Sequence, residues 1–421
     1  MSSDIVYQRL GYLTDHIGAR LSGSKELERA VTWAEQSFIA DGQEGVALEP
    51  VRVPHWVRGA ASAAVLQPVQ RPFELLALGG SVPTPKAELR AELLVVSSFS
   101  ELEARQQEVR GKIVLFDHAM SSEGNPGSSY GEAIPYRTTG ASRAAAKGAV
   151  AVLVRSLTAH SLGAPHTGSM RYLDEHEHKI PAASVSVETA EWLHRLAKGT
   201  TPPNITLSLS PKTLPDADSA NVLAELRGRE RPQELVLIGA HLDSWDVGQG
   251  AQDDGAGVVC VMQALAVLRS LGLVPRRTLR AVLFTNEENG LRGAKRYAEV
   301  HRAELSAHVA AFELDAGAGA PLGFMTNGEQ PFLGEAREIV ALLEPLGAAS
   351  MKPGFAGEDV SVLQPASVPL FGLEPDISHY FDVHHSAADT LDKIDPENLK
   401  KTVAALATMA FVVADQDRAW R

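Results

Sequence analysis

Cysteine is nearly absent from this sequence, with Cys260 the single one among 421 residues. No disulfide can form within the chain, so packing or bound metal must stabilise the fold. Basic residues are also in the minority, with 39 Lys and Arg against 52 Asp and Glu, and the net charge is −13. An acidic surface without a Lys/Arg-rich run repels nucleic acid and anionic lipid, so we expect no nucleic-acid partner.

Long apolar runs are missing as well. The longest, such as Val258 to Leu268, fall far short of the ~20 residues that a membrane span needs, so no membrane partner is expected. The N-terminal residues Met1 to Tyr7 lack the basic and apolar regions of a signal peptide. The sequence therefore fits a cytoplasmic protein or the mature form of an exported one.

Apolar residues are plentiful enough for two domains. They make up 44% of the chain, and 421 residues exceed one ordinary core. Residues 24–42 predict a helix that Ser24 caps and Gly42 ends. Apolar runs at residues 93–96, 113–116 and 149–154, with a small-residue helix at 141–147, predict a separate small domain that ends near residue 210.

After residue 215, predicted strands alternate with predicted helices. The strands fall at residues 235–240, 279–285 and 309–314, and the helices at 257–271 and 291–301. This alternation predicts an α/β fold, in which a mixed, mostly parallel sheet carries helices on both faces. Functional sites of such sheets form beyond the carboxyl ends of the strands.

Candidate metal ligands follow those strand ends in the second half of the chain. They are His241, Asp253, Glu288, Asp315 and His385. Imidazole and carboxylate are zinc ligands, and a pair of ions ~3.5–4 Å apart needs one bridging carboxylate with about two further ligands per ion. We therefore predict two Zn²⁺ ions, with Asp253 as the bridge, His241 and Asp315 on one ion, and Glu288 and His385 on the other.

Two further carboxylates fit roles in hydrolysis. Glu287 stands beside a predicted ligand but diverges from it, so it is free to take a proton from water and pass it to a leaving amine. Asp243, two residues after His241, can hold the other N–H of that imidazole. Any one of these residues alone is more often a surface or capping group, so the prediction of a metallohydrolase depends on the whole set.

Longer segments around these residues resemble a known family. Residues 241–251, 253–254, 285–288, 315–317 and 384–390 are similar to the co-catalytic zinc exopeptidases, which include bacterial leucyl aminopeptidases and glutamate carboxypeptidase II. Within that family, residues 20–24, 48–56 and 165–168 resemble the plasma glutamate carboxypeptidases. The likeness therefore covers nearly the whole chain.

The resemblance implies a fold, cofactors and an activity. It implies a zinc aminopeptidase-like peptidase domain, residues 1–85 and 211–421, with a protease-associated (PA) domain inserted at residues 86–210. It implies two Zn²⁺ ions, an exopeptidase of the carboxypeptidase or dipeptidase type acting on short peptides, a secreted or periplasmic location, and a homodimer. His385 is implied as the ligand because the family's ligand histidine precedes Ser or Thr, which leaves His384 as an oxyanion donor. Gln252 departs from the apolar residue that close relatives often carry beside the bridging Asp253.

Other functions stay open at this point. An aminopeptidase, or an amidohydrolase acting on N-acyl amino acids, would use the same metals, and no arginine cluster near the motifs indicates a carboxylate clamp. A metal-free binding protein on the same fold would have lost ligands that this chain keeps. Residues 127–131 match the G-x-S-x-G motif of serine hydrolases, but Asn125 and Pro126 predict a turn where that motif needs a strand.

Overall fold

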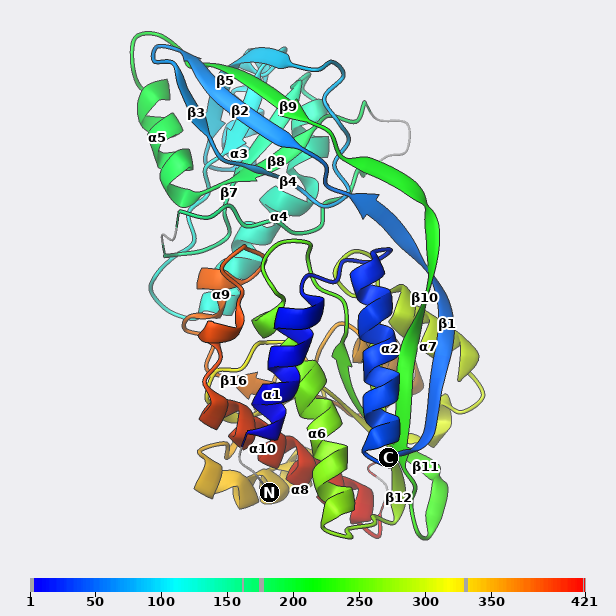
Figure 1. The fold of residues 1–421 in the computed structure, drawn as a ribbon. Coiled ribbons are helices and arrows are strands. Elements are labelled where there is room, and N and C mark those ends of the chain that lie inside the picture. Colours follow the sequence, from blue (N-terminus) through cyan, green and yellow to red (C-terminus); the bar gives the residue numbers. More distant parts are fainter. Residues whose placement is uncertain (1–3, 161–162, 174–177, 329–331, 419, 421) are drawn as a thin grey trace. The chain divides into compact units, whose positions relative to one another are not determined.

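The computed structural model describes residues 4–160, 163–173, 178–328, 332–418 and 420, and the chain folds into two compact units (Figure 1). Unit 1 comprises Met1–Pro54, Asp216–Tyr380 and Asp389–Arg421, and unit 2 comprises His55–Pro215 and Phe381–Ala388. The domain boundaries expected at residues 86 and 210 stay a prediction. Each unit has its own sheet and its own hydrophobic core.

The sheet of unit 1 is mixed and mostly parallel at its centre. Its strand order is β1-β10-β12-β11-β13-β16-β14-β15. Strands β12, β11, β13 and β16 run parallel, whereas β10 pairs antiparallel with β12 and β14 pairs antiparallel with β16. The bounds are β1 (Glu44–Val57), β10 (Lys212–Leu226), β11 (Arg231–His241), β12 (Arg277–Phe284), β13 (His308–Glu313), β14 (Pro321–Thr326), β15 (Ser350–Pro353) and β16 (Leu370–Pro375).

Helices cover both faces of this sheet. Successive side chains of a strand point to opposite faces, and in the buried strands both sets are apolar and pack against helices. Val236 and Ile238 of β11 join the core beneath one helical layer, whereas Leu237 joins a second core that includes Tyr297 of α7. The predicted fold class is thereby confirmed. The helices of this unit are α1 (Ile5–Tyr12), α2 (Lys25–Ala40), α6 (Ala256–Ser270), α7 (Arg292–Val300), α8 (Phe332–Val340) and α10 (Pro396–Asp415).

Local signals in the sequence account for where these helices begin and end. The hydroxyl of Ser24 accepts a hydrogen bond from the Leu27 N–H at 3.1 Å, which caps α2. Beyond its end, Gly42 has φ +72°, the left-handed conformation that glycine adopts without strain. The helix predicted from these two residues is confirmed.

Unit 2 is built on a second sheet of eight strands. Its order is β3-β2-β9-β5-β6-β7-β8-β4, and β5, β6, β7 and β8 run parallel. The bounds are β2 (Ala61–Gln67), β3 (Arg71–Phe73), β4 (Leu76–Ala77), β5 (Leu89–Val96), β6 (Ile113–Phe116), β7 (Ala151–Arg155), β8 (Ala182–Val185) and β9 (Asn204–Leu209), with helices α3 (Phe99–Ala104), α4 (Pro126–Ala145) and α5 (Val187–Ala197). The short helix α9 (Tyr380–Val383) begins at Tyr380, which ends a segment of unit 1, and its other residues belong to unit 2.

Helix α4 differs from the prediction. It begins at Pro126 rather than at residue 141, because the side chain of Asn125 accepts a hydrogen bond from the Ser128 N–H at 3.0 Å. Asn followed by Pro is a turn signal in sequence, but it is equally an N-cap followed by the first helical residue. Residues 127–131 therefore lie within a helix and cannot form a nucleophile elbow. Among the described residues, no helix combines the length and the apolar character that crossing a membrane requires.

Candidate metal centre

Three neighbouring parallel strands carry the predicted ligands of unit 1 at one edge of the sheet. His241 is the last residue of β11 and lies opposite Phe284, the last residue of β12. Glu287 and Glu288 follow β12, and Asp315 follows β13 by two residues. Because parallel strands end at the same edge, residues more than seventy positions apart in sequence meet there.

Three of the predicted ligands come together around the imidazole of His241. Its Nε2 lies 3.1 Å from Asp253 Oδ1 and 3.3 Å from Asp315 Oδ1. One ligand atom from each of the three residues lies within 4.8 Å of the other two. Burial lowers the pKa of His241, but its hydrogen bonds with the two carboxylates outweigh burial and raise that pKa well above the ordinary value.

The other imidazole nitrogen fixes the tautomer of His241. Nδ1 lies 3.0 Å from the main-chain carbonyl oxygen of Asp243, whereas the nearer carboxylate oxygen of Asp243 lies 3.8 Å away. A proton on Nδ1 directed at that carbonyl leaves the Nε2 lone pair facing Asp253 and Asp315. It is thus the backbone of Asp243, rather than the side chain named from the sequence, that holds the ring.

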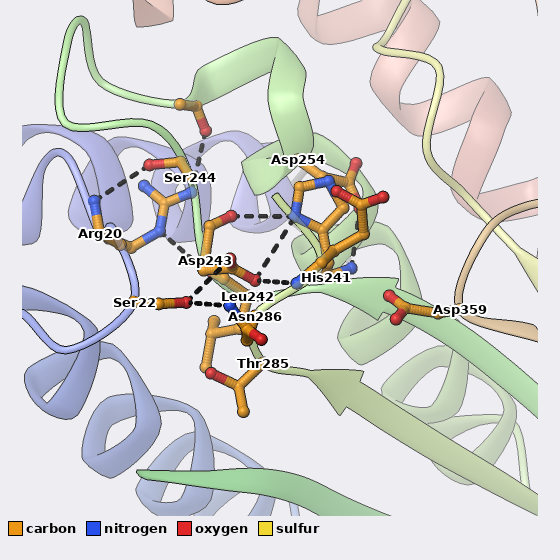
Figure 2. Close-up of polar contacts among 12 residues, drawn as sticks. Arg20, Ser22, His241, Leu242, Asp243, Ser244, Asp254, Thr285, Asn286 and Asp359 are labelled. Atoms are coloured by element: carbon orange, nitrogen blue, oxygen red, sulfur yellow. Dashed lines mark hydrogen bonds and ion pairs between the residues drawn. The ribbon is translucent and has the colours of Figure 1, made fainter. Parts of the chain in front are cut away.

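The carboxylate of Asp243 instead anchors the loop that carries Glu287. Its Oδ1 accepts a hydrogen bond from the Glu287 N–H at 3.0 Å, and its Oδ2 accepts one from the Ser22 hydroxyl at 3.4 Å. The Asn286 amide in turn donates to the Ser22 hydroxyl at 2.9 Å. Figure 2 shows the contacts of Ser22 with Asp243 and Asn286, which join the N-terminal segment to the two strand ends. Asp243 is therefore a positioning residue for Glu287.

Two further carboxylates hold the turn at Ala251–Gly255 that presents Asp253. Asp389 accepts hydrogen bonds from the N–H groups of Ala251, Gln252 and Asp253 at 3.1, 2.7 and 3.2 Å. Asp254 accepts from the His241 N–H at 3.2 Å and from the Gly257 N–H at 3.1 Å, which ties β11 to the start of α6. Burial raises the pKa of Asp389 to about 7.

Arg20 holds the loop between His241 and Asp253 through hydrogen bonds to its backbone. Its side chain is fully buried and donates to the carbonyl oxygens of Gly18, Leu242, Gln249 and Gly250 at 2.8 to 3.1 Å. Figure 2 shows Arg20 beside Leu242. Burial lowers the pKa of the guanidinium to about 10, while nearby Asp389 opposes that shift. The sequence offered one signal for this role, the resemblance of residues 20–24 to the family.

The carboxylate of Asp359 lies beside the metal centre and was not predicted from the sequence. Asp359 is fully buried, and within the described residues neither of its carboxylate oxygens has a hydrogen-bond partner. Its N–H donates to the Glu313 carboxylate at 3.2 Å, next to the Val360 N–H at 2.7 Å. Desolvation raises the pKa of Glu287 and of Asp359 well above their ordinary values, and neighbouring carboxylates, including Asp359 beside Glu287, raise it further. No pattern around residue 359 in the sequence indicates this placement.

The donor set fits divalent cations. Imidazole nitrogen and carboxylate oxygens converge in a buried place, where Asp389, Asp243, Asp254 and Asp253 lie near the fully buried guanidinium of Arg20. Burying several carboxylates without cations costs several kcal/mol, and such groups are retained where they coordinate metal. The mixed nitrogen and oxygen ligands suit zinc.

The two predicted histidines of the C-terminal motif belong to unit 2. His384 is buried, His385 is partly exposed, and their rings stack with centroids 3.6 Å apart. His385 has φ +58°, and its carbonyl oxygen accepts a hydrogen bond from the Thr167 N–H at 2.8 Å. The ring of Tyr130 meets His384 edge-on with centroids 5.2 Å apart.

A buried arginine beside His385 also escaped the sequence analysis. Arg137 of α4 lies with Nη1 3.4 Å from His385 Nδ1 and 3.4 Å from the Thr167 carbonyl oxygen. Its exposure is 5%, and no acceptor among the described residues lies within hydrogen-bond reach of its Nε. Only glycine fits beneath it, because a Cβ at Gly168 would lie 2.4 Å from the guanidinium carbon. Arg137 is 248 residues from His385 in sequence, so no local pattern could have paired them.

Comparison with known families finds two matches in this chain. The profile of peptidase family M28 matches residues 221–410, and that of the PA domain matches residues 83–193. Carboxypeptidase Q of Mus musculus is 43% identical over 411 residues, which cover 98% of this chain and 86% of the relative. Carboxypeptidase Q of Homo sapiens is 42% identical over 411 residues, which cover 98% of this chain and 85% of the relative.

Solved structures give the same picture of the fold. A peptidase M28 precursor from Shewanella amazonensis superposes with a TM-score of 0.95 at 39% identity, covering 100% of this chain and 95% of its own. A zinc aminopeptidase from Bacillus subtilis superposes with a TM-score of 0.71 at 21% identity, covering 99% of this chain and 96% of its own. At that lower identity, the second likeness extends to the fold alone.

Proposed function

The chain belongs to peptidase family M28 and is a metallo-exopeptidase, and we propose that it hydrolyses dipeptides or other short peptides with two zinc ions. The observation that carries the proposal is the meeting of His241 Nε2 with the carboxylates of Asp253 and Asp315. The proposed ligands are His241, Asp253, Glu288, Asp315 and His385. Asp253 would hold both ions, His241 and Asp315 would be the further ligands of one, and Glu288 and His385 would be those of the other.

Different observations support different members of this set. For His241, Asp253 and Asp315 the support is their convergence in unit 1. For Glu288 it is burial at the end of the same strand that presents Glu287. For His385 it is the resemblance of residues 384–390 to the family.

In the proposed reaction, Glu287 moves the proton. Bound zinc supplies a water of lowered pKa and polarises the substrate carbonyl. Glu287 takes a proton from the attacking water at its carboxylate and delivers it to the leaving amine nitrogen. Asp243 keeps Glu287 in place through the Glu287 N–H, and the Asp243 carbonyl keeps His241 in the tautomer that ligation needs. His384 donates a hydrogen bond to the oxygen that gains negative charge.

The proposed substrates carry a free carboxylate at the hydrolysed end. Arg137 supports this, because a peptide carboxylate bound beside His385 would meet a buried guanidinium with an unused Nε–H. Pairing of a guanidinium with a carboxylate is among the stronger hydrogen-bonded contacts in proteins. Dipeptides and N-acyl amino acids share this carboxylate but differ in the free amine. A panel of the two, with dipeptide amides added, separates a dipeptidase or carboxypeptidase from an amidohydrolase and from an aminopeptidase.

The base assignment has a direct test. Replacing Glu287 with Gln keeps the backbone bond to Asp243 and the side-chain size but removes the proton acceptor. Turnover of dipeptides should fall by about 10²- to 10⁴-fold, while the purified variant still binds two Zn²⁺ by metal analysis. A Glu344→Gln variant, at an exposed position of the same unit, is the matched control. Undiminished turnover in Glu287→Gln would contradict the role of Glu287 as the base. Activity that survives complete chelation would contradict the role of zinc in catalysis.

Domain division and assembly complete the proposal. We propose residues 1–85 and 211–421 as the peptidase domain and residues 86–210 as the PA insert, which the PA profile match at residues 83–193 supports. We also propose a homodimer and export from the cytoplasm. Sedimentation of the purified protein and fractionation of the producing cells test these two points.

A further inference from the structure

Gln252 uses its whole side chain to join loops around the metal centre. Its Oε1 accepts a hydrogen bond from the Ala318 N–H at 2.7 Å, and its Nε2 donates to the Lys393 carbonyl oxygen at 3.2 Å. Its own N–H donates to Asp389 at 2.7 Å. Both ends of the amide are thus bonded to backbone groups of other segments.

The segments joined in this way are those that present two proposed ligands. Gln252 immediately precedes Asp253, the proposed bridge, and Ala318 lies three residues after Asp315. The loop between them is packed tightly, since Gly317 has φ +81° and a Cβ there would lie 2.5 Å from Gln252 Oε1. Because Gly317 has no side chain, the Asp315 loop can lie this close to the Gln252 amide.

The carboxylates of Asp253 and Asp315 both contact the ring of His241, and Gln252 adds a link between the two loops that carry them. Asp389 and Asp254 also hold the Asp253 turn, and their bonds run to that turn, to β11 and to the start of α6. The Gln252 side chain instead reaches from the turn to the loop after Asp315. Partners behind the ligands commonly change metal affinity or activity by about 10- to 100-fold.

We propose that Gln252 is a positioning residue that sets the spacing between Asp253 and Asp315, and thereby the affinity for one of the two cations. The inference rests on the proposed function, because it takes those two residues as ligands. A carboxylate that shifts by a few tenths of an ångström loses ligand geometry while the fold around it stays intact.

The test compares two glutamine variants of the metal-free protein titrated with Zn²⁺. Gln252→Met keeps the length of the side chain and removes both hydrogen bonds. Gln249→Met is the matched control, because Gln249 also bonds through both ends of its amide, to Asp15 at 3.0 Å and to the Leu391 N–H at 2.9 Å, without reaching the Asp315 loop. Circular dichroism and thermal melting of the metal-free variants report on folding separately.

Gln252→Met should bind one Zn²⁺ as the unchanged protein does and the other about 10- to 100-fold more weakly. At saturating zinc, its kcat should fall while its KM stays within about twofold, since substrate contacts are untouched. Equal stepwise affinities in Gln252→Met and the unchanged protein overturn the inference, as does an equal loss in Gln249→Met. A Gln252→Met chain whose metal-free form melts far below that of the unchanged protein also overturns it, because the amide is then a stability contact. If no peptide is hydrolysed by any form while the zinc affinities differ as expected, the proposed function fails and the positioning role stands.

Discussion

Removing the guanidinium of Arg20 should loosen the loop that presents His241 and Asp253. Arg20→Met keeps most of the apolar volume of the side chain and removes its donors and its charge. Leu242, Gln249 and Gly250 then lose the hydrogen bonds that hold this loop against the N-terminal segment. The Arg20 side chain is fully buried, so these bonds lie away from bulk solvent.

The magnitude follows from the number of acceptors left behind. Three carbonyl oxygens, those of Gly18, Leu242 and Gln249, lose the Arg20 donor, and each costs about 1 to 3 kcal/mol when it stays buried and unsatisfied. The Gly250 oxygen still accepts from the Gly255 N–H at 3.0 Å. Water can enter the vacated space, so the low end applies and the free energy of unfolding of unit 1 should fall by about 3 kcal/mol. Arg20→Lys should lose about 2 kcal/mol, because a single ammonium keeps the charge but cannot span carbonyls on both sides of the loop.

Hydrogen exchange measured on peptides of unit 1 is the suitable assay. Hydrogen exchange resolves unit 1 from unit 2, whereas a global melting curve reports on both units together. Arg29→Met is the matched control, since Arg29 lies on the exposed side of α2 and should change stability by no more than about 0.5 kcal/mol. A loss under about 1 kcal/mol in Arg20→Met, with unchanged exchange in residues 242–250, would show that other contacts hold the loop and that the reasoning is wrong.

The remaining predictions concern specificity, pH and packing. Arg137→Met should raise the KM for dipeptides by about 10- to 100-fold and leave the KM for dipeptide amides unchanged, because only the former carry the carboxylate; equal effects on both would contradict the clamp. Burial lowers the pKa of His301, but hydrogen bonds with Glu49 and Glu304 outweigh it and raise the pKa above 6.5, so the stabilisation is complete below that value and is lost as pH rises through the folded pKa. Urea unfolding between about pH 6 and pH 8 should therefore show a smaller decline in stability for His301→Gln than for the unchanged protein. Gly317→Ala should cost about 1 to 3 kcal/mol and weaken zinc binding, because the new Cβ would lie 2.5 Å from Gln252 Oε1 and 2.7 Å from the ring of Tyr380; normal zinc titration in that variant would contradict it.

The sequence predicted the architecture well because the relevant signals are local. The apolar run at residues 235–240 lies within β11, the run at 113–116 is β6, and Ser24 caps α2 as its position before the periodic residues indicates. Helix α4 is the exception, because an Asn-Pro pair carries the same local meaning for a turn and for a helix start. Local patterns of this kind name the elements but leave such ambiguities to the tertiary structure.

The sequence by itself determined which residue types could bind metal and where the strands that carry them end. His241, Asp253 and Asp315 could be named because zinc chemistry restricts ligands to a few side chains, and because parallel strands bring their ends to one edge. The tertiary structure decided everything that depends on contacts between distant segments. A backbone carbonyl fixes the tautomer of His241, and Arg20 donates to the loop after that residue. The Asp359 carboxylate is buried without a hydrogen-bond partner among the described residues, and Arg137 lies beside His385. These contacts join residues up to 248 positions apart, and no pattern along the chain encodes a distance that only packing fixes.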